Sequence, residues 1–238
     1  MKLLVLGLDT SAKTCSVALL NGKEVTAEYT QNLPRTHSEK LMPLVDSIFK
    51  DTGRSPGELD AVAVSCGPGS FTGLRIGVAT ARAMAQGLQI PAMGICTLEV
   101  MARGVYSYGS LICPVMDARR SQVYTALYSF KEKSGELQEL HEPAALSLDY
   151  LKDVLQDYRE PVIFLGDGLL SYGQELKEAL GERFLEPASP LVYPRASLVA
   201  WGARERLLYG RGITSYLELK PLYLRASEAE RKYRAKTD

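Results

Sequence analysis

The chain has 238 residues, of which 46% are hydrophobic and 24% charged, a composition typical of globular proteins. Its 28 basic and 28 acidic residues balance, so no general electrostatic attraction to nucleic acid or membrane surfaces is expected. No apolar run approaches the roughly 18–20 residues of a membrane span. The four cysteines contain no C-x-x-C pair, which favours reduced thiols. These features predict a soluble, cytoplasmic protein.

Three antiparallel strands are predicted at the start of the chain. Apolar runs at residues 3–8 and 15–20 are followed by a third strand at residues 23–29. Asn21-Gly22 is typical of the type I′ turn that joins two strands of a hairpin. The first strand ends in Asp9-Thr10-Ser11, so polar side chains follow directly on a buried strand.

A helix is predicted from Thr36 onward. Thr36 and Glu39 have the spacing of a capping box, in which the hydroxyl and the carboxylate each bond a free backbone N–H. Leu41 and Leu44 continue at helical spacing, and Gly53 ends the pattern.

A glycine-rich loop then joins an apolar strand at residues 61–65 to a helix at residues 74–87. Free N–H groups at a helix start attract anions, so a phosphate site is one interpretation of this loop. The spacing of Gly67, Gly69 and Gly73 fits neither a P-loop, which needs a following lysine, nor the dinucleotide fingerprint. A tight strand-to-helix turn with a closely packed helix behind it is the favoured interpretation.

The helix after this loop carries a small-residue ridge at four-residue spacing, made of Gly73, Gly77, Ala81 and Ala85. Another helix or a sheet can sit close to its backbone there, because almost no side-chain bulk intervenes. Arg75 and Arg82 are seven residues apart and share one face. They are predicted to be either solvated or at the rim of a helix–helix interface.

The second half repeats this order in outline. A strand at residues 111–116 ends in Asp117, and a returning strand follows at residues 123–130. A helix at residues 148–158 leads to a strand at residues 162–165, which a glycine turn and a helix at residues 171–180 follow. A last helix is predicted at residues 196–209.

Two domains are therefore expected, with a boundary in the pattern-breaking stretch at residues 104–109. The N-terminal domain covers residues 1–104 and the smaller C-terminal domain residues 105–206. Residues from about 207 to 238 are expected to pack back on the N-terminal domain.

Asp9 and Asp117 are the acidic residues most suggestively placed, each at the end of a buried strand. Facing one another across a cleft, they could hold Mg²⁺ and the phosphates of a nucleotide. The alternative is that each carboxylate bonds N–H groups of its own turn. His37 and His141 are the two histidines, and neither has a second histidine at i+4. Metal hydrolysis with histidine ligands is therefore poorly supported. Serine catalysis is poorly supported as well, because Ser70 is not in a G-x-S-x-G elbow.

Several motifs together resemble the TsaB (YeaZ) family, over nearly the whole chain. They are Asp9-Thr10-Ser11, His37-Ser38-Glu39, the glycine loop from Gly67 to Gly77, Asp117-Ala118-Arg119 and Pro221-Leu222-Tyr223-Leu224-Arg225. The resemblance implies an α/β fold of two RNase H-like domains, of the actin, sugar-kinase and heat-shock ATPase class. It also implies an accessory role in making threonylcarbamoyladenosine on tRNA.

The resemblance further implies partners. TsaB proteins pair with the catalytic paralogue TsaD through helices of the N-terminal domain and recruit the ATPase TsaE. TsaD transfers threonylcarbamoyl to N6 of adenosine 37 of tRNA, so tRNA contact by this chain is expected to be indirect or weak. TsaD-like enzymes carry an H-x-x-x-H metal pair, whereas Leu41 stands four residues after His37 here. The expectation is a non-catalytic subunit without a metal.

The predicted partner interface combines the small-residue ridge with the helix that begins near Thr36: His37, Leu41, Leu44, Gly73, Arg75, Gly77, Ala81 and Arg82. A homodimer through the same surface is expected when TsaD is absent. The alternatives are an ATPase or peptidase in its own right, or a small-molecule kinase of the same fold. ATP or ADP with Mg²⁺ would then sit in the cleft at Asp9, Thr10, Ser11 and Asp117, or at the partner interface.

Overall fold

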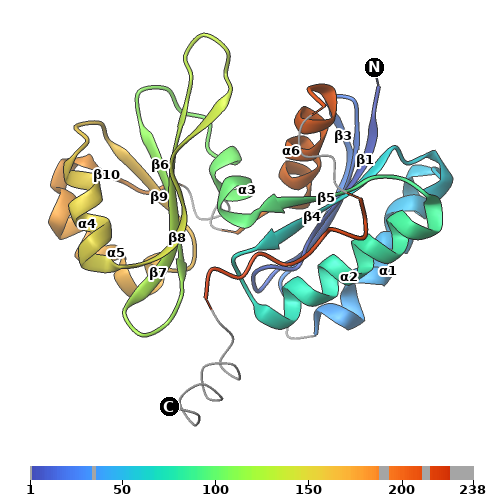
Figure 1. Cartoon of the computed structure of the whole chain (residues 1–238), viewed down its shortest axis with the longest axis horizontal. Coiled ribbons are helices and arrows are strands. Elements are labelled where there is room, and N and C mark those ends of the chain that lie inside the picture. The colour runs from blue at the N-terminus through green and yellow to red at the C-terminus, as the bar shows by residue number, and fades with distance from the viewer. Residues whose placement is uncertain (1, 34–35, 188–192, 211–214, 226–238) are drawn as a thin grey trace.

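The computed structural model describes residues 2–33, 36–187, 193–210 and 215–225 of the chain. These residues form two lobes side by side, each built on a five-stranded sheet (Figure 1). Within the described residues, no helix is both long and apolar enough to cross a bilayer.

The first lobe is a mixed sheet in the order β3-β2-β1-β4-β5. Its strands are β1 (Leu4–Asp9), β2 (Cys15–Asn21), β3 (Glu24–Gln31), β4 (Ala61–Gly67) and β5 (Ala92–Cys96). The first three are antiparallel neighbours, with Leu4 opposite Asn21, and β4 and β5 run parallel to β1. β1 and the first six residues of β2 are buried, because helices cover both faces of the sheet. The predicted opening hairpin and the strand into the glycine loop are confirmed.

Helices α1 (His37–Thr52) and α2 (Phe71–Leu88) lie together on one face of this sheet (Figure 1). The capping box of Thr36 and Glu39 is present, and Gly53 ends α1 in the left-handed region as predicted. α2 begins at Phe71, three residues before its predicted start. It ends beyond Gly87, because Gln89 and not that glycine adopts the left-handed cap conformation.

The second lobe has the sheet order β10-β9-β6-β7-β8, the same topology around its central strand β6 as the first lobe has around β1. Its strands are β6 (Leu111–Asp117), β7 (Gln122–Phe130), β8 (Leu137–Ser147), β9 (Val162–Leu165) and β10 (Phe184–Leu185). Helices α4 (Leu148–Gln156) and α5 (Leu169–Leu180) pack on one face. Because the two sheets share this strand order, the predicted internal repeat is a repeat of topology. Short 3₁₀ turns lie at Pro56–Glu58 in the first lobe and at Gly181–Arg183 in the second.

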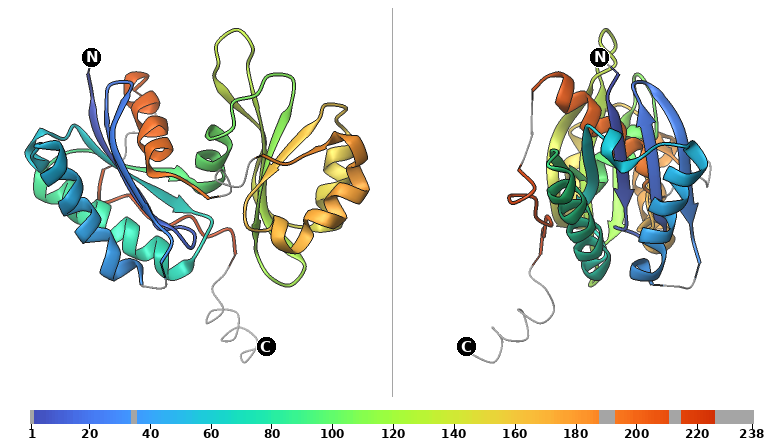
Figure 2. Two further views of the ribbon diagram at one scale, coloured as in Figure 1. Left: turned by 180° about the vertical axis from the view of Figure 1, so that it is seen from behind. Right: turned by 90° about the vertical axis from the view of Figure 1, so that its right-hand side faces the viewer.

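Two helices connect the lobes, because each follows one lobe in sequence but packs against the sheet of the other lobe. α3 (Thr97–Arg103) follows β5, yet its Leu98 and Met101 pack in the core of the second sheet. α6 (Ala196–Leu208) follows the second lobe, yet Val199 and Ala203 pack against the first sheet, on the face opposite α1 and α2 (Figure 2).

The position of α6 corrects the predicted domain boundary. The chain returns to the N-terminal lobe already at Ala196, not near residue 207, because the buried face of α6 matches the open face of the first sheet. Leu219 then packs in the same lobe, against the α1–α2 side of its core. The remainder of the segment predicted to pack on the first lobe is only partly visible, since residues 211–214 and 226–238 lie outside the described part.

Candidate functional site

A cleft of about 850 Å³ lies between the two lobes. Its walls come from the turn after β1, the start of α2, the β6–β7 turn, Asp167 and the extended segment at residues 222–225. A cleft between the lobes was predicted from the positions of Asp9 and Asp117 at the ends of two strands.

Asp9 does not face the cleft. Its side chain is fully buried, and both carboxylate oxygens accept hydrogen bonds from Ser11, whose hydroxyl lies 3.2 and 3.0 Å away. The Ser11 backbone N–H donates to the same carboxylate at 3.2 Å. Burial raises the pKa of Asp9 to about 6, although the hydrogen bonds from Ser11 and the nearby Ser65 hydroxyl act in the opposite direction. Asp9 therefore bonds its own turn, and it is not placed to ligate Mg²⁺ in the cleft.

Thr10 and Ser11 are buried as well. The Thr10 hydroxyl donates to the carbonyl oxygen of Gly73 at 2.7 Å, which ties the turn after β1 to the first turn of α2. Ser11 lines the cleft, but its hydroxyl is bonded to Asp9. The predicted nucleotide contacts of Asp9 and Thr10 are thus taken up by contacts within the chain.

Asp117 is exposed at the opposite wall of the cleft. Its carboxylate accepts the backbone N–H of Arg119 at 2.7 Å, and the Asp117 N–H donates to Asp167 at 3.3 Å. Burial, and then the charge of Asp117, raise the pKa of Asp167. Residues 119–121 all have positive φ angles, of 62°, 56° and 55°, a conformation that non-glycine residues seldom adopt. This turn is a strained feature at the cleft that sequence reasoning missed.

Four basic side chains line the cleft: Lys13, Arg75, Arg119 and Arg225. Two acidic side chains, Asp117 and Asp167, line it with them, so its walls are net positive. Arg225 donates to the carbonyl oxygen of Ala118 at 2.7 Å and so joins the C-terminal segment to the second lobe. Lys13 and Arg225 were not predicted as site residues, because their sequence neighbours carry no ligand motif.

The same C-terminal segment is anchored to the first lobe. The Leu222 N–H donates to the carbonyl oxygen of Cys66 at 2.7 Å. The Tyr223 ring stacks on Phe71 with centroids 4.7 Å apart, and the Arg75 guanidinium lies 4.0 Å from the centre of the Phe71 ring. Arg75 also donates to the Tyr223 hydroxyl at 3.1 Å. Arg75 is therefore partly committed within the chain, although it remains exposed.

His37 lies in the wall of the cleft rather than on the outside of α1. It is half-buried, and a Cβ on Gly73 would lie 3.1 Å from its ring. Burial lowers the pKa of His37, which favours the neutral ring. Four residues later Leu41 is only 1% exposed and packs in the core.

The small-residue ridge of α2 faces inward, which corrects the predicted interface. A Cβ on Gly73 would lie 2.0 Å from the carbonyl oxygen of Thr10, and one on Gly77 would lie 2.4 Å from the Thr10 hydroxyl. Ala81 is fully buried. The ridge packs against the turn after β1 and the sheet of this chain. The sequence had allowed either a sheet or another helix at this position. Leu41 and Leu44 of α1 are buried against the same sheet.

The opposite sides of the two helices are open. We define the outer α1–α2 face as the exposed residues of these helices that point away from the sheet: Met42, Pro43 and Asp46 of α1, and Arg75, Ala79, Arg82, Ala83 and Gln86 of α2. Of the predicted interface residues, Arg75 and Arg82 lie on this face. Met42 is 49% exposed, and Ala79 and Ala83 are exposed positions of α2 with little side-chain bulk.

Comparison with known proteins agrees with this architecture. Residues 23–232 match the model of the TsaD family, described as tRNA N6-adenosine threonylcarbamoyltransferase. The tRNA threonylcarbamoyladenosine biosynthesis protein TsaB of Bacillus subtilis is 35% identical over 229 residues, which cover 96% of this chain and 97% of that protein.

Solved structures give the same result. YeaZ from Pseudomonas aeruginosa superposes with a TM-score of 0.76 at 27% identity, covering 93% of this chain and all of that one. A ROK hexokinase from Thermus thermophilus superposes with a TM-score of 0.50 at 13% identity, covering 85% of this chain and all of the other, and shows the fold alone. The two lobes thus have the fold of the actin, sugar-kinase and heat-shock ATPase class. Together with the sequence match to the Bacillus protein, this shows that the chain belongs to the TsaB (YeaZ) family.

Proposed function

We propose that this protein is a non-catalytic partner subunit that binds TsaD, and through it TsaE, during threonylcarbamoyl transfer to N6 of adenosine 37 of tRNA. Family membership supports the broader role in tRNA threonylcarbamoyladenosine biosynthesis. The outer α1–α2 face is the observation that supports the docking mode. The same face would hold two copies of this chain together when TsaD is absent, and tRNA would be held by TsaD.

The chemistry of this face suits a helix from another subunit. Ala79 and Ala83 are exposed and nearly one helical turn apart, so a second helix can approach the α2 backbone closely. Arg75 and Arg82 are exposed on the same side of α2 and can pair with carboxylates at the rim of the interface. Met42 on α1 adds a flexible apolar contact.

The lack of catalysis is supported by the site described above. Leu41 stands where TsaD-like enzymes have their second metal-binding histidine, and it is buried in the core. Asp9 is enclosed by its own turn. We therefore expect no threonylcarbamoyl transfer by this protein alone.

A double change on the outer face tests the docking mode. Ala79→Gln with Ala83→Gln is expected to weaken TsaD binding at least 10-fold, since two longer side chains hold the helices apart. Glutamine is a good helix former, so the fold is retained. The matched control is Ala179→Gln, an exposed alanine on α5 of the second lobe. Isothermal titration with purified TsaD measures both, and equal affinities for the double variant and the control would reject this docking face.

A second candidate function, binding of a nucleotide in the cleft, is favoured by the basic lining there. Lys13, Arg119 and Arg225 can pair with phosphate oxygens, and Asp117 and Asp167 are the carboxylates that a magnesium ion would meet. The cleft residues therefore suit the phosphates of a nucleotide, whereas Asp9, which was predicted to hold the magnesium ion, is bonded to Ser11 instead. An ATPase or peptidase activity of this chain remains the alternative that such a cleft would serve.

Calorimetry of Mg-ATP with the isolated protein tests this second function. If the cleft binds the nucleotide, Arg119→Ala should weaken binding at least 10-fold, because it removes a charge-assisted contact to phosphate. Arg54→Ala, an exposed arginine of the first lobe, serves as the control. Absence of saturable binding to the unmodified protein would dismiss the nucleotide, without bearing on the TsaD titration.

A further inference from the structure

A second cavity of about 510 Å³ lies beside the two helices that connect the lobes. It is enclosed by α3, α6 and the β7–β8 hairpin, and it shares no lining residue with the cleft described above. Its polar wall is formed by Glu99, Arg103, Tyr128, Glu136, Glu139, Glu205 and Arg206.

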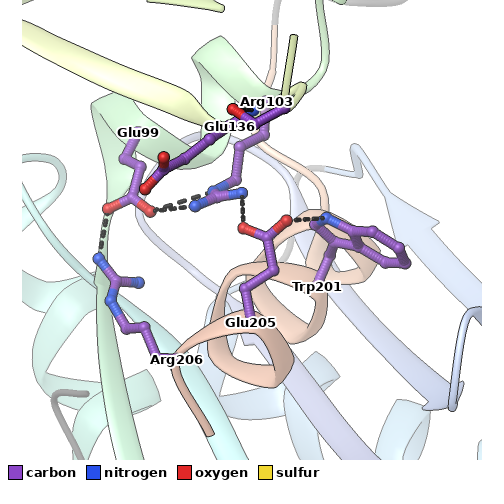
Figure 3. A network of polar contacts seen from close by, with 7 residues as sticks. Glu99, Arg103, Glu136, Trp201, Glu205 and Arg206 are labelled. Carbon is purple, nitrogen blue, oxygen red and sulfur yellow. Dashed lines mark hydrogen bonds and ion pairs between the residues drawn. The ribbon is translucent and has the colours of Figure 1, made fainter. Parts of the chain in front are cut away.

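Part of this wall is a continuous chain of ion pairs (Figure 3). Glu99 accepts from Arg103 at 2.9 Å and from Arg206 at 2.6 Å. Glu205 accepts from Arg103 at 2.6 Å and from the Trp201 ring N–H at 3.0 Å. Two carboxylates and two guanidinium groups balance here, so these four side chains together carry no net charge.

Two buried polar atoms in the wall have no hydrogen-bond partner among the described residues. One is the hydroxyl of Tyr128, a side chain only 1% exposed, and the other is Nη1 of Arg206. The Cys96 thiol lies near the Tyr128 hydroxyl, but a thiol is a weak partner. Buried polar groups in native proteins are nearly always satisfied by protein, water or ligand, so both atoms point to an occupant.

Glu139 supplies the complementary charge. It is an exposed residue at the cavity wall, and no ion pair of it occurs in the described part of the chain. Burial, and then the charges of Glu99 and Glu142, raise its pKa, while His141 and Arg206 act in the opposite direction. The cavity thus offers an unused donor on Arg206 and a carboxylate without an ion-pair partner on Glu139, and Tyr128 lies directly opposite Glu139 on the neighbouring strand.

We propose that this cavity binds a small zwitterion of the α-amino-acid class, with its carboxylate on Arg206 Nη1 and the Tyr128 hydroxyl and its ammonium group on Glu139. An anion alone would leave Glu139 unpaired and would lie among further carboxylates. A cation alone would leave the Arg206 donor unsatisfied. A volume of about 510 Å³ is within the usual range for small-molecule sites.

The bound zwitterion would contact both lobes. Arg206 belongs to α6, which packs on the first sheet, whereas Tyr128 and Glu139 belong to β7 and β8 of the second sheet. Occupancy would therefore stabilise one relative placement of the lobes. This inference is independent of TsaD docking, because no residue of the outer α1–α2 face lines the cavity.

The test begins with thermal shifts of the purified protein against single proteinogenic L-amino acids. At least one should bind saturably, and isothermal titration then compares it with its N-acetyl and its amide derivative. Each derivative lacks one of the two charges and is expected to bind at least 10-fold more weakly. No saturable binding by any amino acid, or an amide that binds as tightly as the free amino acid, would overturn the proposal.

Two variants locate the site. Tyr128→Phe and Glu139→Gln should each weaken binding of that amino acid at least 10-fold, whereas Glu178→Gln on α5 should leave it unchanged. Tyr128→Phe removes an unpaired buried hydroxyl, so its melting temperature should be equal to or above that of the unmodified protein. A Tyr128→Phe protein that keeps full affinity for the amino acid would contradict the assignment.

Discussion

Glu99→Gln is expected to lower the free energy of unfolding by about 3 kcal/mol, because it removes the shared partner of two arginines. The Glu99 side chain is 13% exposed and that of Arg103 12%, so this ion pair is largely shielded from water. Burial alone would lower the pKa of Arg103, but Glu99 and Glu205 more than offset that effect, and the guanidinium stays charged. Without Glu99, Arg103 keeps only Glu205 among its ion-pair partners in the described chain, and Arg206 keeps none.

The matched control for this prediction is Lys131→Met. It removes the pair between Lys131 and Glu136, whose side chains are 48% and 52% exposed. Exposed pairs contribute about 0–1 kcal/mol, so the control should unfold nearly like the unmodified protein. Urea unfolding at neutral pH measures both variants. If Glu99→Gln matched the control, the ion-pair network between α3 and α6 would not hold the lobes together.

Gly73→Ala is the second large change, with an expected loss of about 3 kcal/mol, at the upper end of overpacking effects. The added methyl carbon would lie 2.0 Å from the carbonyl oxygen of Thr10, so the start of α2 or the β1 turn must move. That movement would also strain the hydrogen bond from the Thr10 hydroxyl to the Gly73 carbonyl.

Gly87→Ala provides the control within the same helix. No atom lies within 4 Å of the position that its Cβ would occupy, and its backbone is helical. Alanine is the better helix former there by about 0.5–1 kcal/mol, so this variant should be slightly more stable than the unmodified protein. If the ridge is packed inward, the melting temperature should fall for Gly73→Ala and rise slightly for Gly87→Ala. A tolerated Gly73→Ala would mean that the ridge is open to a partner after all.

The orientation of α2 shows what the sequence could and could not predict. Small residues at four-residue spacing predicted a close contact but not its partner. Leu74 and Val78 lie on the same buried side as the ridge, whereas Arg75 and Arg82 lie on the outside. Reading these apolar and charged positions together with the ridge would have indicated that it faces the core.

The strands of the first lobe were predictable because their signals are local: apolar runs and an Asn-Gly turn. The strand β8 was missed, because residues 137–147 alternate irregularly, contain Pro143, and lie partly exposed at the sheet edge. The exchange of α3 and α6 between lobes was also missed. The pattern of a helix predicts which of its faces is apolar, but not which sheet this face covers. The choice of sheet depends on contacts between residues about a hundred positions apart.

The cleft was predicted at the right strand ends but with the wrong contacts. Asp9 and Asp117 are each the last residue of a central strand, as the repeat implied. The exposure of each carboxylate depends on the turn that follows it. Ser11 bonds the buried Asp9 carboxylate, whereas Asp117, before the strained turn at residues 119–121, stays exposed to solvent. The distant Arg225 could not be assigned to the cleft from local sequence.

The most direct test of TsaD docking is backbone hydrogen–deuterium exchange, measured on this protein alone and in complex with TsaD. The comparison requires a concentration at which light scattering shows the isolated protein to be a monomer, so that a homodimer does not protect the same helices. We predict slower exchange within residues 37–52 and 71–88 in the complex, with α4 and α5 unchanged. Protection confined to α4 and α5, with residues 71–88 exchanging as in the free protein, would contradict the outer α1–α2 face as the docking surface.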